Sequence, residues 1–353
     1  MRSRRRRSDQ PQPEGRADSD ALRSAPVRAG RAVSGATTTR RPAGRPILAI
    51  GRPGGAGRGR TPRRSRLQVA GLPWILPAVV LIVGLIYFSI GYTGYVATLD
   101  WNGFILSSPT HVGADNFTKM VGDSVFWNAI GHTAYFYVIT FSVQTAIGFV
   151  FAAIMHSRVR LGAIYKVIVF VPTVLAPATM APVFRQIFDV DGQFNWLLSH
   201  VGLDALTRPW LAEASTAMAV VMAITVWQWT GLTFILFYAA MSQIDPEILE
   251  AARIDGAGNI RALRSIVWPM CRGTTSALAM LGLIGALKTF DIPYLVTKGG
   301  PNHGTEFLGT YIYQTMVQQK HFGYAAAISV ALLVLAIGGG VLMSMRNRRA
   351  ERR

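Results

Sequence analysis

The chain has 353 residues, of which 50% are hydrophobic and 15% are charged, whereas about a quarter of an ordinary soluble domain is charged. This balance favours a membrane protein, although the formal net charge of +18 at first suggests a nucleic-acid partner. Residues 1 to 66 hold 18 of the 36 Lys and Arg but only 4 of the 18 Asp and Glu, so the charge is concentrated there. The single cysteine, Cys271, excludes an intramolecular disulfide, and no Cys/His cluster predicts a metal site.

Residues 1 to 66 predict a disordered, Arg-rich, cytoplasmic tail. They contain few large apolar side chains, so they bury too little surface to offset the entropy of ordering. The Arg run near Met1 has no interleaved aromatic residues to stack bases, which favours attraction to lipid over nucleic-acid binding. The stretch from Gly54 to Thr61 imitates a phosphate-binding loop, but Arg60 stands at the Lys position. We therefore expect no nucleotide or other cofactor here.

Apolar stretches long enough to cross a bilayer recur six times after the tail. A hydrocarbon core of about 30 Å needs roughly 20 residues of helix. Residues 67 to 345 are therefore expected to form an all-α membrane domain with six transmembrane helices. The third span is short and broken by Pro172, Pro177 and Pro182. The expected spans cover about 72–95, 133–154, 167–184, 216–240, 274–296 and 322–345.

The charges of the loops predict the orientation, because Lys and Arg are retained on the cytoplasmic side. The tail, the loops after the second and fourth spans, and residues 346 to 353 are basic, whereas the other loops carry few cations for their length. Both termini are therefore expected in the cytoplasm of a multi-pass protein of the cell inner (plasma) membrane. The first span lies too far from Met1 to be a cleaved signal peptide, so we expect a retained signal anchor.

The loop between the fourth and fifth spans, Ser242 to Pro269, predicts a cytoplasmic helix-turn-helix. Asp245 is placed to cap a helix that has Pro246 at its first turn and ends at about Ile254. Two glycines then allow a tight turn, and a second amphipathic segment returns to the membrane. The alternative interpretation is an ordinary basic loop.

This loop resembles the EAA loop of ABC importer permeases. The pattern stands here as Glu250-Ala251-Ala252, Asp255-Gly256-Ala257 and Val267-Trp268-Pro269, with Trp268 where the family usually has Leu. The resemblance implies that Glu250, Ala251, Ala252, Asp255, Gly256 and Ala257 belong to a coupling helix that docks into a cleft of a separate ABC ATPase subunit. It also implies a second permease subunit and an extracytoplasmic solute-binding protein as partners.

Two further segments resemble the external loops of the maltose and glycerol-3-phosphate type of importer permease. The first is Val112 to Phe117 with Phe126 to Ala129, and the second is Thr297 to Pro301 with Thr305-Glu306 and Tyr311 to Tyr313. The Gly-Gly-Pro element is typical of the maltose-type half of these heterodimers. The resemblance therefore implies a sugar or oligosaccharide as the solute, with glycerol-3-phosphate or another polar solute as the alternative.

Polar and aromatic residues within two spans are candidates for a substrate pathway. In the fourth span they are Trp227, Gln228, Trp229 and Thr230, where the family places substrate contacts; packing of the tryptophans is the alternative. In the fifth span they are Lys288, Thr289 and Asp291. Charges inside a membrane are costly and need a partner or an aqueous cavity. Lys288 and Asp291 are spaced i, i+3, so they either pair with each other, face the pathway or lie at the external interface.

Two functions of other classes remain as alternatives. A secondary transporter that works alone would use Lys288 and Asp291 as an ion relay, but it has no need of a docking helix. A polytopic membrane enzyme is disfavoured because no Ser-His-Asp set or carboxylate pair is assembled by the sequence spacing. We therefore expect no catalytic residue in this chain.

Overall fold

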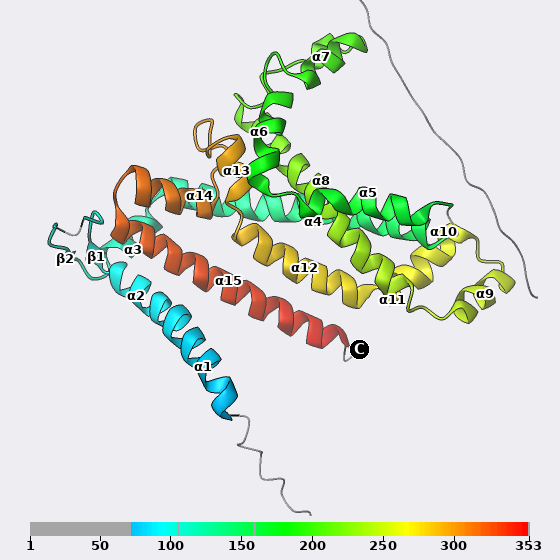
Figure 1. Cartoon of the computed structure of the whole chain (residues 1–353), viewed down its shortest axis with the longest axis horizontal. Coiled ribbons are helices and arrows are strands. Elements are labelled where there is room, and N and C mark those ends of the chain that lie inside the picture. Colours follow the sequence, from blue (N-terminus) through cyan, green and yellow to red (C-terminus); the bar gives the residue numbers. More distant parts are fainter. Residues whose placement is uncertain (1–71, 105, 158–159, 352–353) are drawn as a thin grey trace, which may run out of the picture. The chain divides into compact units, whose positions relative to one another are not determined.

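The computed structural model describes residues 72–104, 106–157 and 160–351, and this part of the chain is mainly helical (Figure 1). The predicted tail and its imitation of a phosphate-binding loop lie outside the described residues. The elements are α1 (Leu72–Ile82), η2 (Val83–Tyr87), α2 (Phe88–Val96), β1 (Leu99–Asp100), β2 (Thr110–His111), α3 (Asp115–Val121), α4 (Ser124–His156), α5 (Gly162–Val174), α6 (Pro177–Ile187), α7 (Gln193–His200), η3 (Asp204–Leu206), α8 (Ala214–Met241), α9 (Pro246–Ile254), α10 (Asn259–Ala262), η4 (Leu263–Val267), α11 (Trp268–Met270), α12 (Arg272–Leu287), α13 (Asp291–Val296), α14 (Leu308–Tyr313), η5 (Gln314–Gln318) and α15 (Phe322–Glu351).

Four unbroken helices are long and apolar enough to cross a membrane: Trp74–Val96, Ser124–His156, Ala214–Met241 and Phe322–Arg348. Two bent helix pairs pass the same test, Gly162–Val174 with Pro177–Ile187 and Asn259–Met270 with Arg272–Leu287. If each bent pair is one span, the total is six, as the sequence predicts. The all-α membrane fold class is therefore confirmed.

The third span bends by 96° between α5 and α6. Leu175 and Ala176 are extended at the bend, and Pro177 opens α6. A residue that precedes proline is driven out of the helical region, which explains the position of the break. The prediction of a broken span is thus correct, but only one of the three prolines breaks it, because Pro172 and Pro182 lie within α5 and α6.

The predicted fifth span, 274–296, is not one continuous helix. Its helix α12 ends at Leu287, and a separate short helix, α13, begins at Asp291. A second bend, of 65°, separates the α10 to α11 segment from α12 at Cys271. The two charged residues of this span therefore flank a helix break instead of sitting within one continuous helix.

The long helices pack closely around α8, which contacts α4 along its length and carries α5 on another side (Figure 1). A Cβ atom at Gly148 of α4 would lie 2.7 Å from the Thr233 methyl group, and one at Gly231 of α8 would lie 2.5 Å from the Val169 carbonyl oxygen. Small residues at helix crossings allow this kind of approach in membrane bundles. The bundle formed by α4, α5 and α8 is therefore the rigid frame on which α12 and α13 lie.

Candidate functional site

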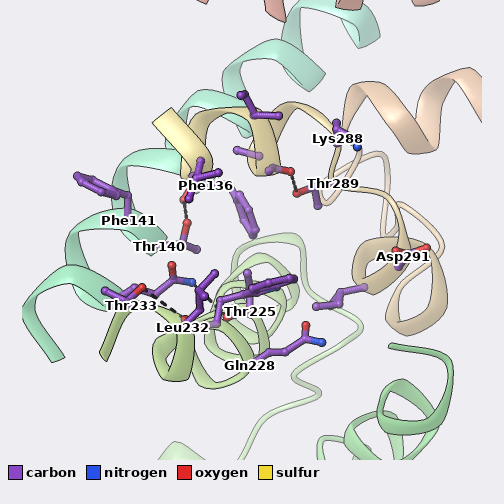
Figure 2. A pocket seen from close by; sticks show the side chains of 18 of the residues that line it. Phe136, Thr140, Phe141, Thr225, Gln228, Leu232, Thr233, Lys288, Thr289 and Asp291 are labelled. Carbon is purple, nitrogen blue, oxygen red and sulfur yellow. Dashed lines mark hydrogen bonds between the residues drawn. The ribbon is translucent and has the colours of Figure 1, made fainter. Parts of the chain in front are cut away.

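A cavity of about 510 Å³ lies between α4, α8, α12 and α13, next to the break in the third span (Figure 2). Aromatic and aliphatic side chains form much of its wall, including those of Phe136, Phe141, Trp229 and Phe290. Polar groups are spread among them, as is usual for a small-molecule site. The polar side chains that line the cavity are those of Thr140, Gln144, Thr225, Gln228, Thr233, Lys288, Thr289 and Asp291.

Of the four predicted residues of α8, two line the cavity and two do not. Gln228 and Trp229 form part of its wall. Trp227 instead packs edge-to-face against Phe184 of α6, with ring centroids 5.1 Å apart, as the packing alternative predicts. Thr230 is buried and donates its hydroxyl to the Val226 carbonyl one turn earlier. Successive residues of a helix point in directions about 100° apart, so four in a row cannot share one face.

Gln228 is held in place by the helix break. It is 2% exposed, and its Nε2 donates to the Leu175 carbonyl oxygen over 3.0 Å. That carbonyl ends α5 and has no partner within the helix, as at any helix end. Gln228 Oε1 has no hydrogen-bond partner among the described residues. A buried amide oxygen without a partner is costly, so this oxygen is left with unused capacity to accept a hydrogen bond.

Lys288, Thr289 and Asp291 line the other side of the cavity, where α12 ends. Thr289 donates its hydroxyl to the Gly285 carbonyl oxygen over 2.9 Å. Lys288 and Asp291 are both exposed and form no ion pair in the part of the chain that the structure describes. The proposed i, i+3 pairing assumed a continuous helix, and the break after Leu287 removes that geometry.

Residues of α4 complete the cavity and were missing from the sequence-based prediction. Phe136, Thr140 and Gln144 repeat at intervals of four residues, so they lie on one face of α4 and line the cavity together. Gln144 Nε2 donates to the Thr225 carbonyl oxygen over 3.2 Å and so links α4 to α8. The four-residue repeat in the sequence indicates one polar and aromatic face of α4. Only the packing of α4 against α8 shows that this face lines the cavity.

The predicted coupling segment forms the expected helix. Its first turn is capped by Asp245, whose carboxylate accepts the Glu247 backbone N–H over 3.0 Å. Ala252 is buried, whereas Glu250 and Ala251 are exposed. After the helix, Gly256 has a φ of +79°, which a residue with a side chain rarely adopts. The exposed part of α9 ends in Ile254, which is 86% exposed.

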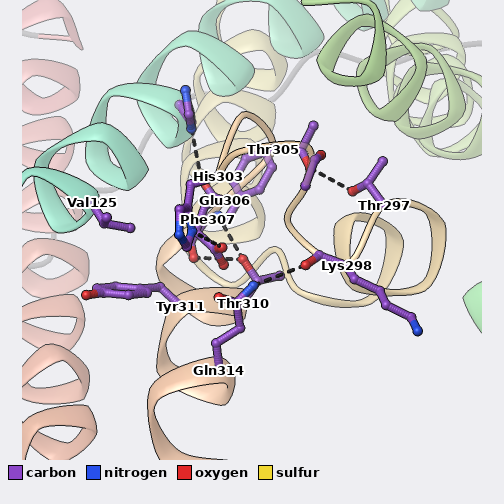
Figure 3. Close-up of polar contacts among 12 residues, drawn as sticks. Val125, Thr297, Lys298, His303, Thr305, Glu306, Phe307, Thr310, Tyr311 and Gln314 are labelled. Carbon is purple, nitrogen blue, oxygen red and sulfur yellow. Dashed lines mark hydrogen bonds and ion pairs between the residues drawn. The ribbon is translucent and has the colours of Figure 1, made fainter. Parts of the chain in front are cut away.

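The Gly-Gly-Pro loop between α13 and α14 is built around a buried carboxylate (Figure 3). Glu306 is fully buried, and its Oε2 lies 3.0 Å from Nδ1 of His303. Its backbone carbonyl oxygen lies 3.0 Å from Nδ1 of His132, which joins the loop to α4. A Cβ atom at Gly299 would lie 2.6 Å from the Glu306 carboxylate. Gly299 also has a φ of +82°, so a side chain at this position would be strained.

A second carboxylate joins three elements near this loop. Asp123 precedes α4 and accepts hydrogen bonds from the hydroxyls of Tyr311 in α14 and Tyr324 in α15. Burial alone would raise the pKa of Asp123, but these hydrogen bonds and those from the Val125 and Phe126 backbone lower it, and the net pKa is below its ordinary value. Burial and the neighbouring carboxylate raise the pKa of Tyr311, so Tyr311 stays neutral and acts as a donor.

Comparison with known proteins identifies the family. Residues 144–352 match the family described as the binding-protein-dependent transport system inner membrane component. The chain belongs to this family. As a member, it is a multi-pass membrane protein and a transport component, and the resemblance carried by the EAA-like segment is confirmed.

Relatives and a solved structure agree with the assignment to this permease family. The chain is 30% identical to the probable ABC transporter permease protein YurN of Bacillus subtilis, over 75% of this chain and 91% of that protein. It is 32% identical to the diacetylchitobiose uptake system permease protein NgcF of Streptomyces coelicolor, over 84% and 88%. A crystal structure of a bacterial ABC transporter that imports alginate shares the fold, with a TM-score of 0.68 and 20% identity over 79% of this chain and 94% of that chain.

Proposed function

We propose that this permease conducts a neutral carbohydrate through the cavity between α4, α8, α12 and α13. The observation that carries the proposal is the composition of the wall, which combines Trp229 with Gln228, Thr140 and Thr225. Sugar rings offer apolar faces and many hydroxyl groups, so they suit a wall of aromatic faces and hydrogen-bonding groups. The name of the relative NgcF, an uptake system for diacetylchitobiose, supports a carbohydrate as the solute.

The charges at the cavity favour a neutral solute over an anionic one. Lys288 and Asp291 carry opposite charges and both line the cavity, so they contribute no net charge to it. The remaining polar side chains of the wall are neutral amides and hydroxyls. A glycerol phosphate would meet only one cation here, and a carboxylate would lie close to it. We therefore rank glycerol-3-phosphate and similar anions below carbohydrates.

The energy for transport comes from a partner in this proposal. The helix α9, with Glu250 and Ala251 exposed, docks into a cleft of a separate ABC ATPase, and closure of the ATPases rocks the spans around the cavity. A second permease subunit completes the pathway, and a solute-binding protein delivers the solute from outside. This arrangement requires both termini, and α9, to be cytoplasmic, which agrees with the basic loops. A transporter that works alone would leave α9 without a role.

Substitution of Lys288 by Met tests the class of solute. The change removes the one cation that lines the cavity while it preserves most of the apolar stem of the side chain. We expect uptake of neutral disaccharides, measured with radiolabelled diacetylchitobiose and lactose in cells that carry the whole importer, to change by less than about threefold, since no direct ion pair is lost. Selective loss of labelled glycerol-3-phosphate uptake would instead assign an anionic solute and contradict the proposal.

A further inference from the structure

The segment between α6 and α8 is a self-supporting excursion from the bundle. Asn195 of α7 is buried, and its side chain donates to the Val190 and Arg208 carbonyl oxygens, each over 2.9 Å. Its Oδ1 accepts the indole N–H of Trp210 over 2.8 Å and the Arg208 backbone N–H. One amide thus ties both ends of the excursion together.

A row of aromatic contacts joins this excursion to the bundle. Phe188 stacks with Phe184 of α6 and lies 5.0 Å from Phe194 of α7, ring centroid to centroid. Phe194 in turn lies 5.1 Å from Trp210. Through Phe184 the row reaches Trp227 of α8. The inner side of α7 is therefore fully used in packing, and its position relative to α6 and α8 is fixed.

The outer side of the excursion is apolar and uncovered. Five large apolar side chains are exposed within a short stretch; we call them the α7 face, and they are Trp196, Leu197, Val201, Leu203 and Leu206. Trp196 is 60% exposed and Val201 is 64% exposed. Between residues 192 and 206, Asp204 is the only residue with a formal charge when His200 is neutral. An apolar cluster of this size on a membrane protein marks a surface that contacts something other than water.

We propose that α7 is an interfacial helix whose α7 face inserts into the headgroup region of the lipid bilayer. The helix has 8 residues, so at about 1.5 Å per residue it is far too short to span the hydrocarbon core. The 96° bend before α6 turns the chain away from the direction of the spans.

The chemistry of the α7 face fits lipid better than a protein partner. Tryptophan is enriched at the boundary between headgroups and hydrocarbon, where its apolar ring and polar N–H are both accommodated. The ring of His200 lies against that of Trp196 with the ring centroids 3.9 Å apart, and its Nδ1 lies 2.8 Å from the Trp196 carbonyl oxygen, so this polar group is engaged locally. Apolar side chains are also exposed along the chain that leads here, at Val174, Val183 and Val190. The apolar surface therefore continues from the third span to α7.

Site-directed spin labelling tests this inference. Leu197→Cys and Leu206→Cys are labelled one at a time in a Cys271→Ala background, because Cys271 is the single native cysteine. The full chain is reconstituted with its co-purifying subunits in vesicles of phosphatidylethanolamine and phosphatidylglycerol. Accessibility to oxygen and to a water-soluble nickel chelate is then measured, with doxyl-labelled lipids as depth standards. Asp191→Cys, at an exposed polar position just before α7, is the matched control.

We expect oxygen to relax the labels at Leu197 and Leu206 more strongly than the nickel chelate does, at the depth of the headgroups. The control at Asp191 should show the reverse. Added salt should not change the result, because residues 192 to 206 carry a single formal charge. Strong relaxation by the nickel chelate at both test positions would show that the face lies in water. Immobile labels shielded from both agents would show that a protein subunit covers it, and either outcome would overturn the inference.

Discussion

Gln228 makes a structural hydrogen bond and has a proposed role in transport. Its Nε2 is fixed by the Leu175 carbonyl oxygen, its Oε1 is buried without a partner in the described part of the chain, and the residue lines the cavity. Thr230, two residues later, is equally buried but bonds only within its own helix. This pair of neighbours allows an effect on the solute to be distinguished from a general effect on α8.

Substitution of Gln228 by Leu should reduce uptake by about tenfold, because a hydrogen bond worth about 1 to 1.5 kcal/mol is lost from the bound solute. The measurement is the initial rate of ATP-dependent uptake of the transported sugar as a function of its concentration. Thr230→Val, which removes a hydroxyl that does not line the cavity, serves as the control and should leave uptake nearly unchanged. Equal losses in the two variants would contradict a direct role of Gln228.

Asp123 gives a prediction about stability. Its folded-state pKa is lowered, so its stabilising contribution is present above the pKa of an unfolded Asp, near 4, and is lost as the pH falls through the lower folded-state pKa. At pH 7, Asp123→Asn should cost about 1 to 3 kcal/mol, because hydrogen bonds to a charged group are replaced by neutral ones. The thermal midpoint of the purified protein reports this loss.

The difference between wild type and Asp123→Asn should shrink as the pH falls from about 4 through the lowered folded-state pKa. Asp100→Asn is the control, since Asp100 is exposed and has no side-chain hydrogen bond among the described residues. Equal midpoints for Asp123→Asn and wild type at pH 7 would show that the link between α4, α14 and α15 contributes nothing to stability.

At the scale of elements, the sequence was sufficient to predict a helix or a break where the residues that determine it are adjacent in the chain. The helix α9 begins at Pro246 and ends at Ile254 as predicted, because an acidic cap, a first-turn proline and a following glycine define it without help from other elements. The break in the third span followed from its prolines in the same way, although the sequence did not show that Pro177 alone would cause it.

Other elements could not be predicted because their determinants are far apart in sequence. The break between Leu287 and Asp291 has no proline or glycine within it, and the sequence suggested only that charges interrupt the span. The face of α4 that lines the cavity depends on which side of that helix packs against α8. The local sequence of α4 does not reveal that side. For the same reason Trp227 and Thr230 were placed with Gln228 and Trp229, although only the latter two line the cavity.

At the scale of elements, the N-terminal cap of α9 allows a prediction about the stability of this helix. Asp245→Ala removes the hydrogen bond to the Glu247 amide and should destabilise the exposed helix by about 1 kcal/mol. Amide hydrogen exchange in α9 should then become about fivefold faster. Asp245→Ser retains a capping oxygen and should exchange at close to the wild-type rate. If Asp245→Ala and wild type exchange equally fast, the cap does not hold this helix.

At the scale of the whole molecule, the chain is one part of a transport machine. The bundle around α8 provides a rigid wall, the breaks in the third and fifth spans open a cavity within it, and α9 extends from its other end as an exposed helix. The first span, Trp74–Val96, is long and apolar, and none of its most apolar window is buried within the chain. A surface this large needs lipid or a second subunit to cover it.

The most direct test is capture of the tagged chain from gently solubilised membranes, followed by identification of the subunits that accompany it. We predict that wild type brings down a second permease and an ABC ATPase, and that Glu250→Lys, a charge reversal on the exposed side of α9, loses the ATPase and keeps the permease. Glu213→Lys, the same reversal at an exposed residue outside α9, should retain both partners. A wild-type chain that comes out alone and still transports sugar without ATP in vesicles would contradict the account.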